Sequence, residues 1–387
     1  MKKGLRNSTY QVQCFTQRTQ RPQSFLLNDK KKLCDLCVLC VKHAFILPII
    51  SLLLAAEPLT AQQTPLSSLY QMNWQTINPA TIDRSFYLND ATPMTIFTGS
   101  YRQQWIGFEG APSNAFLSAE FLTERQDRYN VGAFTKFGIS FLNDRFGAFN
   151  NWGVYGNYTY GFGGSGQCLY VGLSPGLIRS QISLSKNSSS IDPLIADYQG
   201  RSKLYFDLGV GVFYRNIEDP DRQFFCGLSI PQSLAVGLEN DSLHQRFLPK
   251  NRLQHLNFLA GMFIDPTGEE QKGLRIEPSI LVKYAPLSGG TALIPNLPLA
   301  FDVNCRAYLP LNRFVKKDIE NFWLGAGYSS NTNLSIELGI TKNLEDDARF
   351  GRGTRFVRIG LLYSVPLGNR FVNFGQTIEA LASFSLE

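Results

Sequence analysis

The segment LRIEPSILVKY, residues 274–284, alternates apolar and polar side chains over most of its length. In an extended chain Leu274 and Ile280 lie on one face, whereas Arg275 and Glu277 lie on the other. A period of two is typical of a β-strand with one apolar face and one polar face. The segment therefore predicts a strand, and what each face contacts depends on how many such strands the chain contains.

The same alternation recurs along the chain in segments of roughly 10 residues. Clear examples are YFDLGVGVFY (205–214), QHLNFLAGMFI (254–264), LAFDVNCRAYL (299–309) and LSIELGI (334–340). A tilted strand of about this length crosses a bilayer, and many of the segments end in tyrosine, as expected at a membrane interface. Because lipid requires that no strand edge stay open, the pattern predicts an all-β fold, a transmembrane antiparallel β-barrel.

About 14 strands are expected, an even number as in bacterial outer-membrane barrels. Their predicted starts are near residues 96, 113, 130, 150, 167, 203, 222, 253, 273, 298, 320, 333, 354 and 376. Long polar connections around 183–200, 237–250 and 286–296 are predicted extracellular loops.

The polar face of these strands is predicted to line the interior of the barrel. Its charged and histidine residues are Asp207, His255, Arg275, Glu277, Lys283, Asp302, Arg306, Glu337 and Arg358, with Asn257, Asn304 and Glu379 beside them. Buried charges of opposite sign tend to pair, because a buried unpaired charge is costly. The mixture favours an interior that holds a plug or is crossed by salt bridges, and an open, water-filled lumen is the alternative.

The N-terminal residues resemble an export signal. Lysines precede the apolar run AFILPIISLLLAA (44–56), which at 13 residues is short for a spanning helix, and Ala61 is a plausible last residue before cleavage. We expect an export leader over 1–61, a lead-in or plug segment over 62–93 and the barrel over 94–387.

Several classes of function are disfavoured by composition. The leader alone carries 9 Lys/Arg against 3 Asp/Glu, which leaves 28 of each sign in the rest of the chain, so no basic surface for nucleic acid is expected. Beyond the leader only His244 and His255 are present, without a nucleophile motif or metal-ligand spacing. GFGGSG (161–166) precedes a strand rather than a helix, which predicts a turn. We expect no enzyme activity, no cofactor and no metal.

Two motifs distinguish this chain from a generic barrel. YQMNWQTINPA (70–80) contains Asn78-Pro79, which no regular strand ladder accommodates, so it predicts a periplasmic lead-in or a hatch in the lumen. YRQQWIGFEGAPSN (101–114) is predicted to shape the first hairpin. Their characteristic residues are Tyr70, Asn73, Asn78 and Pro79 in the first motif, and Gln104, Trp105, Gly107, Gly110, Ala111 and Pro112 in the second.

These motifs, in this order, resemble the PorP/SprF family of outer-membrane proteins. The resemblance implies a component of the type IX secretion system that assists secretion or surface anchoring of particular cargo proteins such as adhesins, and gliding motility where the organism glides. It implies a translocon, a cargo protein and outer-membrane lipid as partners, with no small-molecule substrate. The alternative is a channel for small or hydrophobic molecules, since the strand number and an N-terminal Asn-Pro-Ala hatch are also similar to the long-chain fatty-acid transporter family.

Overall fold

The computed structural model describes the N-terminal segment 69–82 and most of the remainder to residue 386. Not described are residues 1–68, 71, 83–94, 128–129, 164–165, 184–201, 217, 220–221, 239–254, 267–272, 285–298, 311–318, 331–332, 345–354, 368–374 and 387. The predicted export leader, most of the three predicted extracellular loops and His244 lie outside the described residues.

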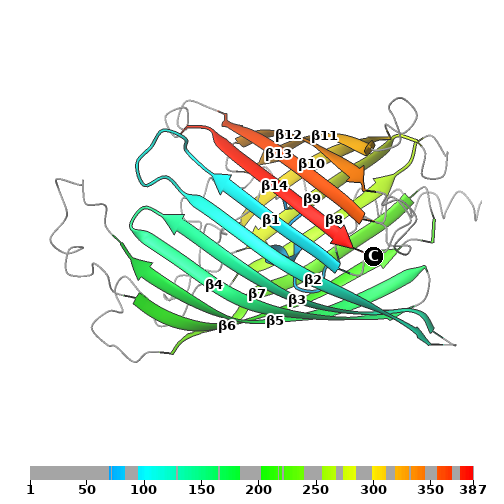
Figure 1. Ribbon diagram of the computed structural model, residues 1–387, viewed down its shortest axis with the longest axis horizontal. Coiled ribbons are helices and arrows are strands. Elements are labelled where there is room, and N and C mark those ends of the chain that lie inside the picture. Colours follow the sequence, from blue (N-terminus) through cyan, green and yellow to red (C-terminus); the bar gives the residue numbers. More distant parts are fainter. Residues whose placement is uncertain are drawn as a thin grey trace, which may run out of the picture. The chain divides into compact units, whose positions relative to one another are not determined.

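The described chain forms a closed barrel of fourteen antiparallel strands in sequence order (Figure 1). The strands are β1 (Thr95–Gln103), β2 (Ser113–Asp127), β3 (Asn130–Phe146), β4 (Phe149–Gly163), β5 (Gln167–Ile182), β6 (Ser202–Asn216), β7 (Arg222–Gly237), β8 (Leu256–Ile264), β9 (Arg275–Tyr284), β10 (Leu299–Pro310), β11 (Ile319–Ser329), β12 (Asn333–Asn343), β13 (Arg355–Pro366) and β14 (Thr377–Leu386). β1 pairs with β14, from Thr95 opposite Leu386 to Gln103 opposite Ile378, and this pairing closes the barrel.

The predicted fold class and strand number are confirmed, and every predicted start lies within three residues of the observed one. The expected length of roughly 10 residues is wrong for β2 to β7, which have 15–17 residues each. Sixteen residues at ~3.3 Å each, tilted by ~45°, rise about 37 Å, more than an apolar band of ~25 Å requires. The long strands therefore continue their hydrogen-bonded pairing beyond the membrane, where polar residues such as Asp144 and Arg145 of β3 are in contact with water.

The two faces of the wall are inverted relative to a soluble protein. Large apolar side chains point outward and are exposed, including Leu117, Ile139 and Ile336 at 54–58%. Charged side chains point inward, and Arg306 and Glu337 are at most 1% exposed. An exposed apolar surface of this extent requires lipid around it.

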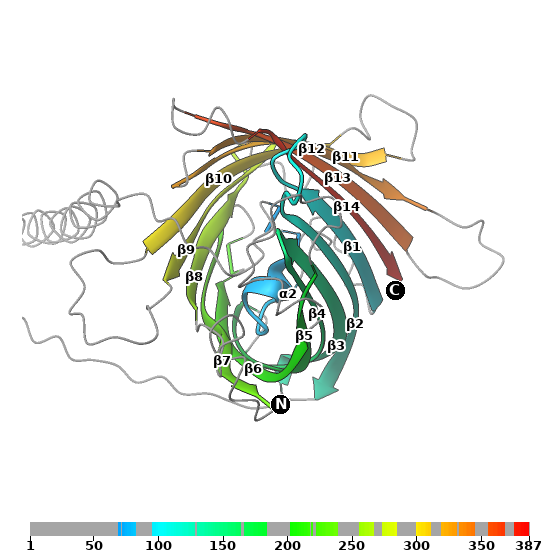
Figure 2. The same cartoon turned by 90° about the vertical axis from the view of Figure 1, so that its left-hand side faces the viewer.

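Inside the barrel lies one short helix, α2 (Trp74–Ile77), seen when the barrel is viewed along its axis (Figure 2). Among the described residues no helix is long and apolar enough to cross a membrane.

The connections at the two ends of the barrel differ in length. The end at which β1 begins and β14 finishes has connections of up to 11 residues, such as that between β12 and β13. The opposite end carries the longest connections, after β5, β7 and β9, which include the three predicted loops. Outer-membrane barrels have short periplasmic turns and longer extracellular loops, so the opposite end is the extracellular one.

This orientation predicts which engineered thiols are reachable from outside the cell. Glu109, between β1 and β2, and Glu218, between β6 and β7, are both exposed but lie at opposite ends. With Cys168, Cys226 and Cys305 replaced by Ala, Glu109→Cys should react with a membrane-impermeant maleimide on intact cells. Glu218→Cys, the matched control, should react only after the outer membrane is permeabilised; the reverse pattern would invert the assignment.

Candidate functional site

Residues 69–82, apart from 71, form a plug within the barrel. Asn78-Pro79 ends the turn of α2, because proline has no N–H to continue a helix or to join a ladder. All described residues of the plug except Gln75 and Thr76 are buried, and Leu69 and Ala80 are fully inaccessible. In the described structure this segment therefore lies inside the barrel.

The C-terminal half of the plug offers backbone carbonyls to the wall. The carbonyl of Ile77 accepts hydrogen bonds from Ser229 Oγ on β7 at 2.6 Å and from Asn257 Nδ2 on β8 at 3.2 Å. Pro79 O accepts from Thr159 Oγ1 on β4 at 2.7 Å. Lys136 Nζ on β3 donates to the carbonyl of Thr81. These contacts satisfy carbonyls that an irregular buried segment would otherwise leave unpaired.

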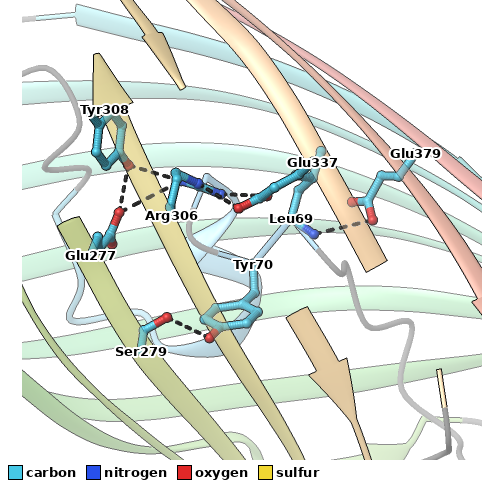
Figure 3. Close-up of polar contacts among 8 residues, drawn as sticks. All are labelled: Leu69, Tyr70, Glu277, Ser279, Arg306, Tyr308, Glu337 and Glu379. Carbon is cyan, nitrogen blue, oxygen red and sulfur yellow. Dashed lines mark hydrogen bonds and ion pairs between the residues drawn. The ribbon is translucent and has the colours of Figure 1, made fainter. Parts of the chain in front are cut away.

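The N-terminal half is held by side chains of three other strands, β14, β9 and β1. Leu69 N donates to Glu379 Oε2 on β14 at 3.3 Å, and the Tyr70 hydroxyl bonds Ser279 Oγ on β9 at 2.7 Å (Figure 3). Asn73 Nδ2 donates to Ser100 Oγ on β1 at 2.8 Å. Burial raises the pKa of the Tyr70 phenol above its ordinary value.

Asn78 lies directly against two glycines of the wall, Gly211 and Gly227, which we call the glycine seat. Its Oδ1 accepts from Ala80 N at 2.9 Å, and its Nδ2 donates to the carbonyl of Val212 on β6 at 3.0 Å. A Cβ on Gly211 would lie 2.0 Å from Asn78 Oδ1, and one on Gly227 would lie 2.7 Å from Nδ2. Only glycine lets the wall approach the plug this closely. Including this contact, the plug is hydrogen-bonded to eight of the fourteen strands.

A belt of aromatic side chains surrounds part of the plug. The aromatic belt consists of the buried, inward-facing residues Tyr170, Phe213, Phe225, Phe263, Tyr308 and Trp323. Neighbouring rings in it are 6.0–6.4 Å apart, centroid to centroid. Trp74 of α2 packs on Phe213 at 5.6 Å and on Phe225 at 5.0 Å. The plug is therefore fixed by apolar packing as well as by hydrogen bonds.

A buried ionic network lies beside the plug (Figure 3). Arg306 on β10 donates to both carboxylate oxygens of Glu337 on β12, at 2.7 and 2.8 Å, and from Nη1 to the Tyr308 hydroxyl at 3.1 Å. That hydroxyl donates to Glu277 Oε2 on β9 at 2.6 Å. Two carboxylates thus share one guanidinium. The guanidinium carbon of Arg306 also lies over the Trp323 ring, 5.9 Å from its centroid. The network connects β9, β10 and β12, which lie on one side of the barrel wall.

The other predicted interior residues are placed as follows. Lys283 forms an ion pair with the partly buried Asp302 at 2.5 Å. His255 Nδ1 and Gln232 Oε1 are 3.2 Å apart, and Asp207 accepts from the Tyr155 hydroxyl at 3.0 Å. Asn257 contacts the plug as described above, and Asn304 and Arg358 are buried. Arg275 is partly exposed near the periplasmic end of β9.

The second motif forms the connection between β1 and β2 at the extracellular rim. Gln104 N donates to Pro112 O at 2.9 Å, which closes the loop at its base. Two backbone hydrogen bonds join the loop to its neighbours: Ile106 N to Gln376 O, just before β14, and Gly147 N, in the β3–β4 turn, to Gly110 O. We call residues 104–112 the rim loop.

The rim loop is preorganised and exposes apolar side chains. Trp105 has φ 49°, a left-handed conformation that is unfavourable for a bulky residue, and its ring packs on Phe146 at 6.2 Å. Gly107 and Gly110 have φ of 98° and 74°, where glycine is the favoured residue. Ile106 and Phe108 are 42% and 52% exposed. Among the two motifs, then, one fills the interior and the other shapes the outer rim.

Sequence reasoning did not single out Lys136, Ser229, Thr159 or the seat glycines Gly211 and Gly227. The glycines have a signal, since each replaces a side chain at an inward position of an alternating strand. Lys136 has no such sequence signal. Its partners, Glu120 at 3.5 Å from Nζ and the carbonyl of Thr81, are brought to it only by the fold. Within the described part of the chain, no group of His, Cys, Asp or Glu could hold a metal ion.

Comparison with known proteins gives a family and a set of distant barrels. A model of the type IX secretion system membrane protein PorP/SprF matches residues 59–384. No curated protein is significantly similar in sequence. The similar solved structures include a mutant of the TodX monoaromatic hydrocarbon channel (11% identity, 82% of this chain, 94% of that chain, TM-score 0.44) and the Ralstonia pickettii toluene transporter TbuX (11%, 86%, 96%, 0.42).

The glycine seat predicts a steric sensitivity that is specific to the plug. Gly211→Val should clash with Asn78 and lower the free energy of unfolding by at least about 1–3 kcal/mol, the cost of overpacking. Gly156→Val on β4 is the control, because a Cβ there meets nothing within 4 Å. Folded barrel is quantified by heat-modifiable gel mobility and by denaturant unfolding in lipid vesicles. Equal behaviour of the two variants would contradict the close approach.

The ionic network predicts non-additive energetics. Glu337→Leu leaves Arg306 buried without its bidentate partner and should cost about 3–5 kcal/mol of unfolding free energy. The double variant Arg306→Met, Glu337→Leu should cost clearly less than the sum of the two single variants, because neither charge remains. Denaturant unfolding of the four proteins measures the coupling, and additive costs would show that the pair is not coupled.

Proposed function

Because the chain belongs to the PorP/SprF family of type IX secretion system membrane proteins, we propose that it is an accessory barrel that assists secretion or surface anchoring of particular cargo proteins. It is an outer-membrane protein, since its closed barrel has the apolar outer wall of that membrane's proteins. The cargo class we propose is surface adhesins, with gliding motility as the process served where the cell glides.

The observation that carries this proposal is the plugged interior. Hydrogen bonds to eight strands, the aromatic belt and the glycine seat hold the plug, and a fourteen-strand barrel so filled has no passage for a folded protein. The cargo therefore crosses through a separate, larger translocon, and this barrel acts by its outer surfaces. Both the translocon and the cargo are proposed partners.

The rim loop is the contact surface that best fits this role. It lies at the extracellular end, its backbone is tied to two neighbouring loops, and it presents Ile106 and Phe108 outward. Exposed apolar side chains on a rigid loop lose little conformational entropy on binding, which favours docking. We assign to the rim loop the binding of an apolar patch on the cargo or translocon.

A channel for small or hydrophobic molecules is the alternative. In a channel the plug would have to move, because its residues occupy the interior. The two functions therefore make opposite predictions for a plug that is fixed covalently.

The test compares surface proteins and solute uptake in the same cells. Loss of the gene should remove one or a few large surface proteins and leave uptake of small solutes unchanged. Asn73→Cys and Ser100→Cys, bridged by oxidation or a short dithiol-reactive linker in a background with Cys168, Cys226 and Cys305 replaced by Ala, should leave both unchanged. Reduced cells are the control. Loss of uptake on bridging would instead support the channel.

The rim loop is tested with the same surface inventory. Ile106→Ser with Phe108→Ser should lower display of the cargo at least tenfold at an unchanged amount of folded barrel. Leu238→Ser is the matched control, since Leu238 is also an exposed apolar residue at the extracellular end, after β7. Normal display by the rim variant would exclude the rim loop as the contact.

A further inference from the structure

The outer wall carries an apolar hollow of about 660 Å³ over the seam where the barrel closes. It extends across six strands that are neighbours in the barrel: β13, β14, β1, β2, β3 and β4. Its centre is made by small residues, because Gly99 on β1 lies opposite Ala382 on β14, and Ala119 on β2 lies opposite Phe97. The hollow is thus a dent left by three missing side chains.

Large apolar side chains surround this dent. In one row across the strands Phe384, Phe97 and Ile139 flank Ala119, and in the next row Leu117 and Phe141 follow Gly99. Thr98 and Ser383 also border it, but they are inward positions of β1 and β14, and their buried hydroxyls bond each other at 3.0 Å on the interior side. No charged residue lines the hollow. Its chemistry fits a hydrocarbon and offers nothing to a headgroup.

The height of the hollow agrees with that chemistry. Gly99 is the fifth of the nine residues of β1, and Ala382 is the sixth of the ten residues of β14. The middle of a spanning strand lies at the level of the lipid hydrocarbon. Acyl chains of the surrounding lipids are therefore what contacts this part of the wall.

The size of the hollow decides which of three possible occupants fits it: a helix, a second copy of the barrel or a single flexible chain. A helix with its side chains is about 10–12 Å across, which is too thick to sink into a dent that lacks only three side chains. A second copy would present another convex wall, and fourteen lining residues are fewer than the 20–30 per side of a standard interface. A single flexible chain can follow an irregular apolar surface.

We propose that the hollow holds one acyl chain of an outer-membrane lipid as an ordered component of the barrel. The chain replaces the missing side chains at Gly99, Ala119 and Ala382 and covers the β1–β14 seam. This inference is independent of the proposed role in secretion, because it concerns only the lipid-facing wall.

The experiment fills the hollow and counts bound lipid. Full-length barrel is extracted in mild detergent, washed until annular lipid is removed, and analysed by native mass spectrometry. The wild type should retain one lipid per barrel, and Ala119→Leu with Ala382→Leu should retain at least tenfold less. Ala260→Leu with Ala326→Leu, outward alanines of β8 and β11 outside the hollow, should match the wild type.

Further readouts keep the test decisive. Ala382→Val fills the hollow less and is the substitute if the double variant fails to fold. It should retain an amount of lipid between those of the wild type and an empty barrel. Added outer-membrane lipid should raise the Tm of the wild type and of the control variant but not that of a filled variant. Equal lipid retention in all proteins would overturn the proposal. So would a wild-type dimer that filling the hollow converts to monomer, because the occupant would then be a second copy.

Discussion

A closed sheet of fourteen strands encloses more space than its own inward side chains can fill, since about eight strands is the width at which side chains meet across the axis. The structure meets this constraint by folding the start of the chain into the interior. Trp74 of the plug packs on the aromatic belt, and Asn78 lies against Gly211 and Gly227, where a larger side chain would not fit. On the wall, Gly211, Gly227, Ser229 and Ser279 are matched to this one segment.

The charged interior is a second consequence of the same constraint. An interior filled with protein has little water to solvate Arg306 or Lys136, so each needs partners within reach. Arg306 has two carboxylates and two aromatic faces, whereas Lys136 combines Glu120 with a plug carbonyl. Charges of both signs were therefore a sign of a filled lumen, and a water-filled pore would not have required such pairing.

Period-two alternation was sufficient for the barrel, because outward and inward residues differ so strongly in polarity along each strand. The lengths of the strands could not be predicted in the same way, because the alternation in β3 and β5 does not change where the strand leaves the lipid and continues in water. Asn78-Pro79 indicated a break from regular structure and left two locations open. Choosing between them required the contacts with Gly211, Ser229 and Ser279, which lie 130 or more residues away and depend on the closed sheet. The rim loop was recognised as a motif, but its ties to residues 147 and 376 join it to other strand connections and also depend on the closed sheet.

The plug precedes β1 in the chain, and its grip includes both strands of the seam: Asn73 bonds Ser100 of β1, and Leu69 bonds Glu379 of β14. The segment that precedes β1 is thus secured by the strand that closes the wall. A barrel that lacks its final strand has neither its closure nor the carboxylate that holds the plug's beginning. Closure of the wall and locking of the interior are consequently coupled, so a barrel in which β14 has not joined β1 lacks both at once.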